Sequence, residues 1–369
     1  MAPQMNDPVK RAIYSGSGGR EAAPGLHPCG TAASILSLMR PDREDQRDRS
    51  EAAWHAVVLS WNGREDTIEC LESLVRVSRP KLRVVCVDNG STDGSQAAIR
   101  ASFPEVHLIE AGANLGYSAG NNLGIRYALD EGAEWVVLVN NDATVAPDVI
   151  DGFVTAARAR PRAGILAGKV YFADRPHTIW FAGQRVSEYV GYSGRPRGYG
   201  REDAPRYSHI QATGRAVGAL MAVSRGAVEA VGMLEEDLFA YVEDVDWALR
   251  VRRAGLEVVL APGAHAWHRV SASSGGEAAS TTTLYYGVRN TVVVLERRRP
   301  LGRLATRLRR LAIFTSFAFH ALTRADRGKA LAAVRSGYRD ARHGRLGPRP
   351  AGAAGRVVGA GGAGASPPR

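Results

Sequence analysis

The stretch Trp135-Val-Val-Leu-Val-Asn-Asn-Asp142 is an apolar run that ends abruptly in three polar side chains. Five consecutive apolar residues are typical of a β-strand that is covered on both faces of its sheet. Asp142 follows at the point where such a strand would leave the core, and a carboxylate is costly to bury there. The stretch therefore predicts a buried strand with a functional carboxylate at its end.

Similar apolar runs and helical patterns alternate through the preceding residues. We expect strands at residues 56–60, 82–87 and 106–109, and helices at residues 65–76, 95–102 and 119–130. This alternation predicts an α/β fold with a mainly parallel, doubly wound sheet. Residues 165–295 are less regular, with short strand candidates and a helix at residues 244–254.

Polar loops follow all four predicted strands. They are Ser60-Trp-Asn-Gly63, Asp88-Asn-Gly-Ser-Thr-Asp93, Asn114-Leu-Gly-Tyr-Ser-Ala-Gly-Asn-Asn122 and Asn140-Asn-Asp142. Any one of them could simply form a turn or a helix cap. Because the carboxyl ends of parallel strands meet at one edge of a sheet, the four loops together predict a ligand site.

Each loop carries groups suited to a nucleotide. Asp88 can accept hydrogen bonds from a pyrimidine or a ribose, and Gly116 and Gly120 would let the backbone approach a ligand closely. Asp142 suits Mg²⁺ or Mn²⁺ held jointly with diphosphate oxygens. His268 is a second candidate metal ligand, although alone it would be read as an ordinary half-buried histidine. The sequence contains no GxGxxG or Walker motif, which disfavours dinucleotide and ATP-binding folds.

A second acidic segment, Phe239-Ala-Tyr-Val-Glu-Asp-Val-Asp-Trp247, places three carboxylates in apolar surroundings. One of them could take a proton from a nucleophile. Glu243 and Asp246 could raise the pKa of Asp244 through like-charge proximity. They could equally be acidic residues that stabilise a helix N-terminus.

Composition divides the 369-residue chain into four parts. Its apolar fraction of 45% is that of a globular protein. Three cysteines at unrelated spacings indicate buried thiols in a reducing cytoplasm rather than a disulfide framework. No signal peptide and no apolar run of about 18 residues is visible. We expect a disordered arm at 1–52, a catalytic domain at 53–295 (halves 53–165 and 166–295), a basic helical extension at 296–346 and a disordered tail at 347–369.

Positive charge is concentrated at the C-terminal end. From Leu301 onward there are 14 Lys and Arg residues and 2 Asp and Glu residues, whereas the first 300 residues sum to −1. In the predicted helix that follows, three arginines share one face and three leucines a neighbouring face: Arg303, Arg307, Arg310, Leu304, Leu308 and Leu311. A basic amphipathic helix suits an anionic membrane surface, although it could also pack on the enzyme body. No nucleic-acid-binding motif accompanies the charge, so nucleic acid is not an expected partner.

Five segments in this order resemble family 2 glycosyltransferases, most closely the rhamnosyltransferase-like branch. They are residues 57–63, 87–95, 114–122, Asn140-Asn-Asp142 and Tyr241-Val-Glu-Asp-Val-Asp246, within a resemblance that covers roughly residues 55–295. The resemblance implies a GT-A fold, a nucleotide-diphosphate-sugar donor, a divalent metal (Mg²⁺ or Mn²⁺) and inversion at the anomeric carbon.

The same resemblance implies roles for particular residues. Asp244 matches the catalytic base, Asp142 the last residue of the metal-binding DxD motif, and His268 a metal-ligating histidine after Pro262-Gly-Ala264. Asn140 replaces the first Asp of that motif, which predicts weaker metal binding but not inactivation. The expected donor-binding residues are Asn62, Asp88, Asn89, Asn114, Gly116, Asn121, Asn141 and Asp142. The expected sugar or acceptor pocket contains Gly218, Glu243 and Trp247.

We therefore expect an inverting, metal-dependent hexosyltransferase that acts on a glycan or lipid-linked acceptor. L-Rhamnose from dTDP-rhamnose is the expected donor sugar, and a UDP-galactose or UDP-glucose donor is the alternative. A catalytically silent protein that keeps the fold and recruits partners through its basic helices is the alternative from another class. The expected location is the cytoplasm, peripheral on the inner face of the plasma membrane.

Overall fold

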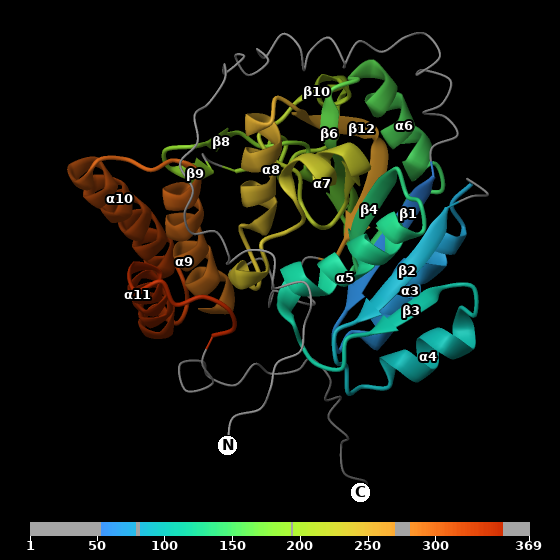
Figure 1. Cartoon of the computed structure of the whole chain (residues 1–369), viewed down its shortest axis with the longest axis horizontal. Coiled ribbons are helices and arrows are strands. Elements are labelled where there is room, and N and C mark those ends of the chain that lie inside the picture. Colours follow the sequence, from blue (N-terminus) through green and yellow to red (C-terminus); the bar gives the residue numbers. More distant parts are fainter. Residues whose placement is uncertain (1–52, 79–81, 193–194, 270–280, 350–369) are drawn as a thin grey trace, which may run out of the picture. The chain divides into compact units, whose positions relative to one another are not determined.

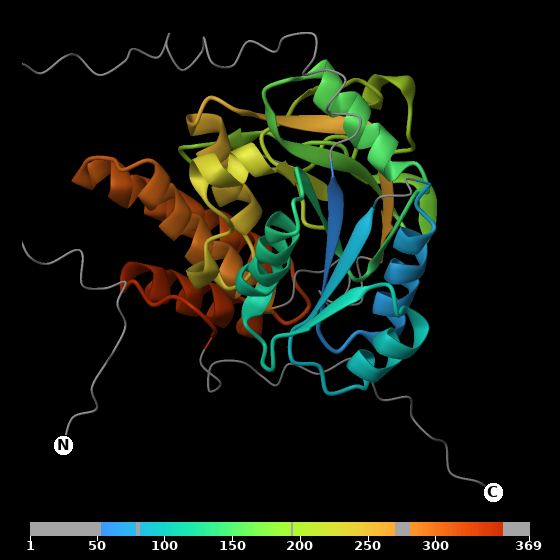
Figure 2. The same cartoon turned by 45° about the vertical axis from the view of Figure 1, so that its right-hand side comes forward.

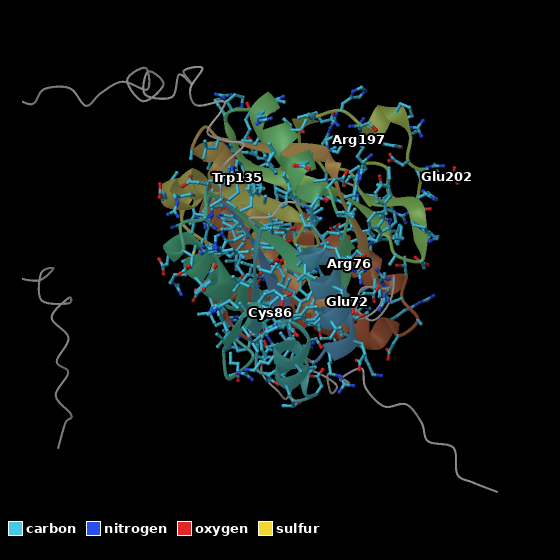
Figure 3. The ribbon with its side chains drawn as sticks, turned by 90° about the vertical axis from the view of Figure 1, so that its right-hand side faces the viewer. Glu72, Arg76, Cys86, Trp135, Arg197 and Glu202 are labelled. Atoms are coloured by element: carbon cyan, nitrogen blue, oxygen red, sulfur yellow. The ribbon has the colours of Figure 1, made fainter. Side chains whose placement is uncertain are left out.

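The computed structural model describes residues 53–78, 82–192, 195–269 and 281–349. The predicted arm at 1–52 and the tail from residue 350 lie outside these ranges, as does Cys29. Cys70 and Cys86 are both buried as free thiols, as predicted. Figure 3 shows Cys86 in the interior of the fold, and Trp135 lies on the same sheet at the start of its strand.

The first half of the chain forms the parallel part of one large sheet. Its strands lie in the order β3-β2-β1-β4, and every neighbouring pair is parallel. Their bounds are β1 (Trp54–Ser60), β2 (Arg83–Asp88), β3 (His107–Glu110) and β4 (Trp135–Asn140). The chain moves outward from β1 to β3 and then returns to place β4 on the other side of β1. This reversal creates the topological switch point at which such sheets bind ligands.

Helices cover the two faces of this parallel part. α3 (Arg64–Val75) and α4 (Ser95–Ser102) contact each other, whereas α5 (Gly116–Asp130) packs on β1, β2 and β4. Figures 1 and 2 show α5 on one face of the sheet and α3 on the other. The reversal of direction explains this, because right-handed crossovers of opposite direction place their helices on opposite faces. All the elements predicted between residues 56 and 139 are present.

The second half extends the same sheet with longer strands than the sequence predicts. β6 (Ala163–Phe172) and β12 (Glu257–His268) run parallel to each other, and the antiparallel β11 (Met221–Ser224) joins β6 to β4. Every residue of β6 is buried, yet the Gly and Lys residues within it interrupt the apolar pattern. The remaining elements are β5 (Ala143–Val145), α6 (Val149–Ala159), β7 (Arg175–Phe181), β8 (Val186–Ser187), β9 (Gly191–Tyr192), η2 (Pro205–Tyr207), β10 (Gln211–Ala212), α7 (Arg225–Val231), η3 (Glu236–Leu238) and α8 (Glu243–Arg253).

Three C-terminal helices form a separate layer beside α8. They are α9 (Thr281–Arg298), α10 (Arg303–Leu322) and α11 (Arg327–Arg342), and Figure 1 shows them gathered at one end of the sheet. α9 lies between α8 and the other two helices and contacts all three. The apolar side chains of these helices form a second core that also includes Val245 and Leu249 of α8. Within the described residues, none of the helices combines the length and apolar content needed to cross a bilayer.

Close packing between α6 and β12 gives a test of the second half of the sheet. A Cβ atom on Gly152 would overlap the backbone of Gly263, which cannot move aside as a side chain could. We expect Gly152→Ala to lower the free energy of unfolding by about 1–3 kcal/mol in urea titrations. Gly226→Ala in α7, where a Cβ would meet nothing within 4 Å, should be neutral or stabilising. Equal effects of the two substitutions would contradict the packing described here.

Candidate active site

The carboxyl ends of β1, β2 and β4 lie level with one another. Ser60 pairs with Asp88, and Leu59 pairs with Asn140. Because β11 is antiparallel to β4, it begins at this same edge, and Met221 pairs with Leu138. The strand register therefore brings residues from both halves of the chain to one edge of the sheet.

Asp88 has one satisfied and one unpaired carboxylate oxygen. Its Oδ2 accepts hydrogen bonds from Gly90 N (3.2 Å), Ser91 N (3.1 Å) and Gln96 Nε2 (2.8 Å). Its Oδ1 is buried without a partner among the described residues. A buried unpaired acceptor costs free energy, so this oxygen is suited to a ligand's N–H or O–H donor.

Asparagine side chains connect the loops at this edge. Asn62 Oδ1 accepts from Thr92 N (2.8 Å), which joins the first loop to the second. Asn89 Oδ1 accepts from Leu115 N (3.0 Å), and its Nδ2 donates to Asn114 Oδ1 (3.2 Å), which joins the second loop to the third. These three predicted donor-binding residues thus shape the loops that would surround a donor.

The other predicted donor-binding residues differ in position. Asn141 Nδ2 donates to Thr67 Oγ1 (3.1 Å), which joins the fourth loop to α3. Asn121 is buried within α5, where its Nδ2 donates to Tyr117 O (2.9 Å). Gly116 begins α5 with φ +85°, and a Cβ there would collide with Phe239. Gly116 therefore permits close contact with the loop that precedes α8.

Asp142 and His268 lie in contact although they are far apart in sequence. Asp142 Oδ1 is 2.9 Å from His268 Nε2, and both side chains are buried. The antiparallel pairing of β5 with β12 explains this, because it sets His268 opposite Ala143. His268 Nδ1 is buried without a hydrogen-bond partner among the described residues. The ring of Trp180 packs edge-on against His268, with the ring centroids 4.8 Å apart.

These two residues fit two positions of a divalent-metal site. Carboxylate oxygen and imidazole nitrogen are ligands that Mn²⁺ accepts, and two ligands at right angles and about 2.1 Å from an ion lie about 3 Å apart. No group of three or more His, Cys, Asp or Glu side chains suited to a metal occurs among the described residues. Asn140 Oδ1, buried and unpaired among the described residues, lies at the same strand end.

Glu243 and Asp244 begin α8 and have different surroundings. Arg215 forms an ion pair with Asp244 Oδ2, while Asp244 Oδ1 accepts from Val245 N (2.7 Å). Glu243 Oε2 is buried and has no partner among the described residues. Burial, followed by the nearby charge of Asp244, raises the pKa of Glu243 to about 8. The raised pKa of Glu243 was not predicted from the sequence.

Asp246 has a structural role. It is fully buried and accepts from Arg250 Nε (2.7 Å) and Arg298 Nε (2.6 Å), so it joins α8 to α9. Trp247 is also fully buried, and its indole N–H donates to Gly232 O (2.8 Å). The structure thus places Trp247 in the core beneath α8.

Tyr117 lies at the centre of these carboxylates, and the sequence analysis did not identify it. Burial and the charges of Glu243, Asp244 and Asp142 raise its pKa well above the usual value. A Cβ on Gly218 would collide with the Tyr117 hydroxyl, which places Gly218 at the same point. Tyr117 belongs to the polar segment 114–122, so its position in that segment could have marked it as a site residue. Arg215 lies in the irregular half of the chain, where no local pattern marks it.

A cavity of about 460 Å³ lies elsewhere and contains none of the predicted site residues. Its lining includes Arg83, Val84 and His107, which begin β2 and β3. The amino ends of parallel strands face away from the edge where Asp88 and Asn140 lie. This cavity is therefore separate from the candidate active site.

The raised pKa of Glu243 predicts a pH-dependent stability difference. Because this pKa exceeds the ordinary value of 4.5, the folded protein binds the proton more tightly than the unfolded chain. The free energy of unfolding should therefore fall as the pH rises from the ordinary pKa of 4.5 to the raised pKa of about 8. We expect Glu243→Gln to stabilise the protein by on the order of 2 kcal/mol near pH 8.5 and far less near pH 5, measured by urea unfolding.

Glu72→Gln provides the matched control for this experiment. Glu72 is exposed on α3, and Figure 3 labels it near Arg76, with which it forms a 3.4 Å ion pair. This substitution should leave the pH dependence of stability nearly unchanged, because exposed ion pairs contribute little. If the stability of Glu243→Gln varies with pH as the wild type does, burial does not raise the pKa of this carboxyl.

The sequence is similar to proteins of one enzyme family. Residues 56–223 match the profile of Glycosyl transferase family 2. An N-acetylglucosaminyl-diphospho-decaprenol L-rhamnosyltransferase from Mycobacterium tuberculosis is 33% identical over 224 residues, covering 56% of this chain and 72% of that protein. A dTDP-rhamnosyl transferase, RfbF, from Shigella flexneri is 26% identical over 259 residues, covering 66% of this chain and 80% of that protein.

A solved structure is similar in fold. The crystal structure of GalNAc-T7 with UDP, GalNAc and Mn²⁺ matches with a TM-score of 0.51 and 14% identity, covering 66% of this chain and 48% of that chain. Together with the central sheet, its flanking helices and the C-terminal helices, these similarities confirm the predicted GT-A fold class and enzyme class. The chain is a glycosyltransferase, and it belongs to glycosyltransferase family 2.

Proposed function

We propose that this protein transfers L-rhamnose from dTDP-rhamnose to a hydroxyl group of a lipid-linked glycan, with inversion at the anomeric carbon. The observation that carries the proposal is the convergence of Asp88, Asp142 with His268, and Glu243 with Asp244 at one edge of the sheet. The choice of sugar and acceptor is supported by the two relatives whose names include rhamnosyl transfer, one of them to a diphospho-decaprenol carrier. A UDP-hexose donor is the alternative to be tested.

The donor would bind along the polar loops. Asp88 Oδ1 is the buried acceptor that suits the N–H of a pyrimidine ring, because its other oxygen is already used within the loop. The bonds from Asn62 and Asn89 to neighbouring loops would keep this position fixed. Asp142 and His268 would then face the diphosphate from the next strand end.

Asp142 and His268 would hold the divalent metal. When bound, such an ion neutralises the negative charge that develops on the departing diphosphate. The replacement of a first carboxylate by Asn140 leaves one acidic ligand, so the diphosphate itself must supply much of the negative charge at the site. Metal affinity in the absence of donor should accordingly be weak.

Asp244 would act as general base toward the acceptor hydroxyl. Its two oxygens each carry two lone pairs, so the carboxylate can accept a further proton while bonded to Arg215 and Val245 N. Arg215 would fix the orientation of the carboxylate. Glu243, protonated at neutral pH because its pKa is about 8, would donate a hydrogen bond beside it.

Substitution of the proposed base tests this mechanism. We expect Asp244→Asn to reduce transfer by at least about 10³-fold while donor affinity changes by less than about threefold, because the base does not contact the nucleotide. Binding of dTDP-rhamnose, UDP-galactose and UDP-glucose would be measured by calorimetry with and without Mn²⁺. Radiolabelled sugar transfer to a lipid-linked acceptor would then be followed.

Each outcome of this experiment is informative. Metal-dependent binding of dTDP-rhamnose alone would support the proposed donor, and binding of a UDP-sugar alone would replace it with the alternative. Transfer that survives in Asp244→Asn would exclude Asp244 as the base. Absence of binding to all three donors would overturn the proposed donor class and favour a silent binding protein.

We also propose that α10 holds the enzyme on an anionic membrane surface. Its outward side chains form an apolar stripe at helical spacing: Leu304, Leu308, Leu311, Phe319 and Leu322, each 48–70% exposed. Arg303 and Arg307 are exposed beside this stripe, whereas Arg310 turns inward to Glu296 of α9. Residues 281–349 contain 16 Lys and Arg residues against 3 Asp and Glu residues. This charge favours an anionic lipid surface over a neutral partner.

Vesicle binding tests the stripe. We expect Leu308→Glu/Leu311→Glu to weaken binding to vesicles that contain phosphatidylglycerol by at least about tenfold, because two leucines that the membrane would bury are lost and two negative charges are added. The control, Ser316→Glu/His320→Glu, adds the same charge elsewhere on the exposed surface of α10 and should bind much more tightly. Equal weakening by both variants would indicate a purely electrostatic effect. A change in oligomeric state, measured by sedimentation velocity, would indicate that a second copy covers the stripe.

A further inference from the structure

The loop that delivers Glu243 and Asp244 has a strained backbone. Phe239, Tyr241 and Val242 have φ values of +66°, +67° and +74°. Positive φ is costly for residues with a Cβ, and most of all for a β-branched residue such as Val242, at about 1–3 kcal/mol each. Among the described residues, Asn62 is the only other non-glycine residue with positive φ. This conformation must therefore be held in place by the rest of the structure.

The amide nitrogen of Asn290 in α9 lies within hydrogen-bond distance of three carbonyl groups of this loop, which share its two hydrogens. Its Nδ2 lies 3.0 Å from Leu238 O, 2.8 Å from Ala240 O and 2.7 Å from Tyr241 O. The loop is held on its other side by α5, because Tyr117 N donates to Phe239 O (2.6 Å). The carbonyl groups of residues 238–241, which precede the helix cap Val242, thus all accept hydrogen bonds from α9 or α5.

Arg289 fixes the orientation of the Asn290 amide. Its Nε donates to Asn290 Oδ1 (2.8 Å), so the amide nitrogen of Asn290 must face the loop. Its Nη2 donates to Leu238 O (2.8 Å), and its Nη1 donates to Gly347 O (2.7 Å). Arg289 is fully buried, and within the described ranges no carboxylate forms an ion pair with it. The hydrogen bonds of Arg289 therefore go to neutral oxygens. One of them reaches the loop at Leu238, and another reaches the side chain of Asn290.

The burial of this charge indicates a specific purpose. An arginine without a carboxylate partner is costly to bury, and an apolar residue would pack in the α9 core at lower cost. The ring of Tyr286 lies 4.7 Å from the Arg289 guanidinium and offsets part of this cost. What an apolar residue could not supply is the set of directed donors that the strained loop requires.

We infer that Arg289 and Asn290 are positioning residues for catalysis: they hold the strained loop 238–242 and so set the place of Glu243 and Asp244 in the active site. The inference depends on the proposed function only in taking Asp244 as the base. It assigns to α9, which lies beyond residues 56–223 matched by the family profile, an influence on the reaction through loop 238–242. A displacement of the carboxylates by about 1 Å would cost about 10²-fold in rate.

Asn290→Asp is the sharpest test of this inference. It keeps the size of the side chain and the oxygen that accepts from Arg289, but it removes the amide donors to the loop. We expect kcat to fall by about 10²-fold, while the Kd for the donor changes by less than about threefold, because the donor loops are not touched. Hydrogen exchange of the peptide that covers residues 238–246 should rise in the same variant.

Val292→Ala is the matched control. Val292 lies on the same helix and is buried in the same core, but it makes no polar contact with the loop. It should lower the thermal midpoint while kcat and exchange at 238–246 stay near wild type. The positioning role is excluded if Asn290→Asp keeps kcat within about threefold of wild type. It is also excluded if Asn290→Asp lowers kcat, donor affinity and stability together, because that result indicates general loss of structure.

Asp244→Asn, assayed beside these variants, separates the two proposals. If Asp244→Asn retains transfer, the base assignment fails whatever Asn290→Asp does, and exchange at residues 238–246 still reports whether Asn290 holds the loop. If Asp244→Asn abolishes transfer and Asn290→Asp does not impair it, the positioning inference alone is wrong.

Discussion

Amide side chains that bridge neighbouring loops are the interaction on which this active site depends. Parallel strands end in exposed backbone groups, and the loops that follow them have no ladder of their own. Asn62 and Asn89 join the first three loops, and Asn290 plays the same part for the loop before α8. Asparagine suits this work because one short, uncharged side chain both donates and accepts hydrogen bonds. The hydrogen bonds between the loops can then keep the buried carboxylates in fixed positions at the edge of the sheet.

Charge is balanced unevenly among the three carboxylates of the first turn of α8. Asp244 has Arg215 as a partner and Asp246 has two arginines, whereas Glu243 is buried and its pKa is raised to about 8. Burial thus favours the protonated form of Glu243 at neutral pH, while its neighbours in sequence are paired with arginines. This is a common arrangement where one group must accept a proton and its neighbour must donate a hydrogen bond.

The sequence predicted the first half of the fold well because its signals are local. β2 and β4 contain continuous apolar runs that end in polar loops, and α5 begins only three residues before its predicted start. The second half was harder, since Lys169 is buried within β6 through its ion pair with Asp203, far along the chain. Arg215 and Asn290 act only through long-range contacts, so no local pattern could identify them. His268 was a weak candidate until the family resemblance supported it, and strand register explains why it meets Asp142.

The pairing of Asp142 with His268 also constrains the order in which the protein becomes functional. The two residues are separated by 126 positions, whereas the pairings of β1 with β2 and of β2 with β3 join strands that follow one another along the chain. Contacts across long separations form late, because the intervening chain must first be ordered. A nascent chain could therefore assemble the nucleotide-facing strands while it is still being synthesised. Asp142 would meet His268 only after β12 had emerged and docked, so a partly made chain would lack this pair of side chains.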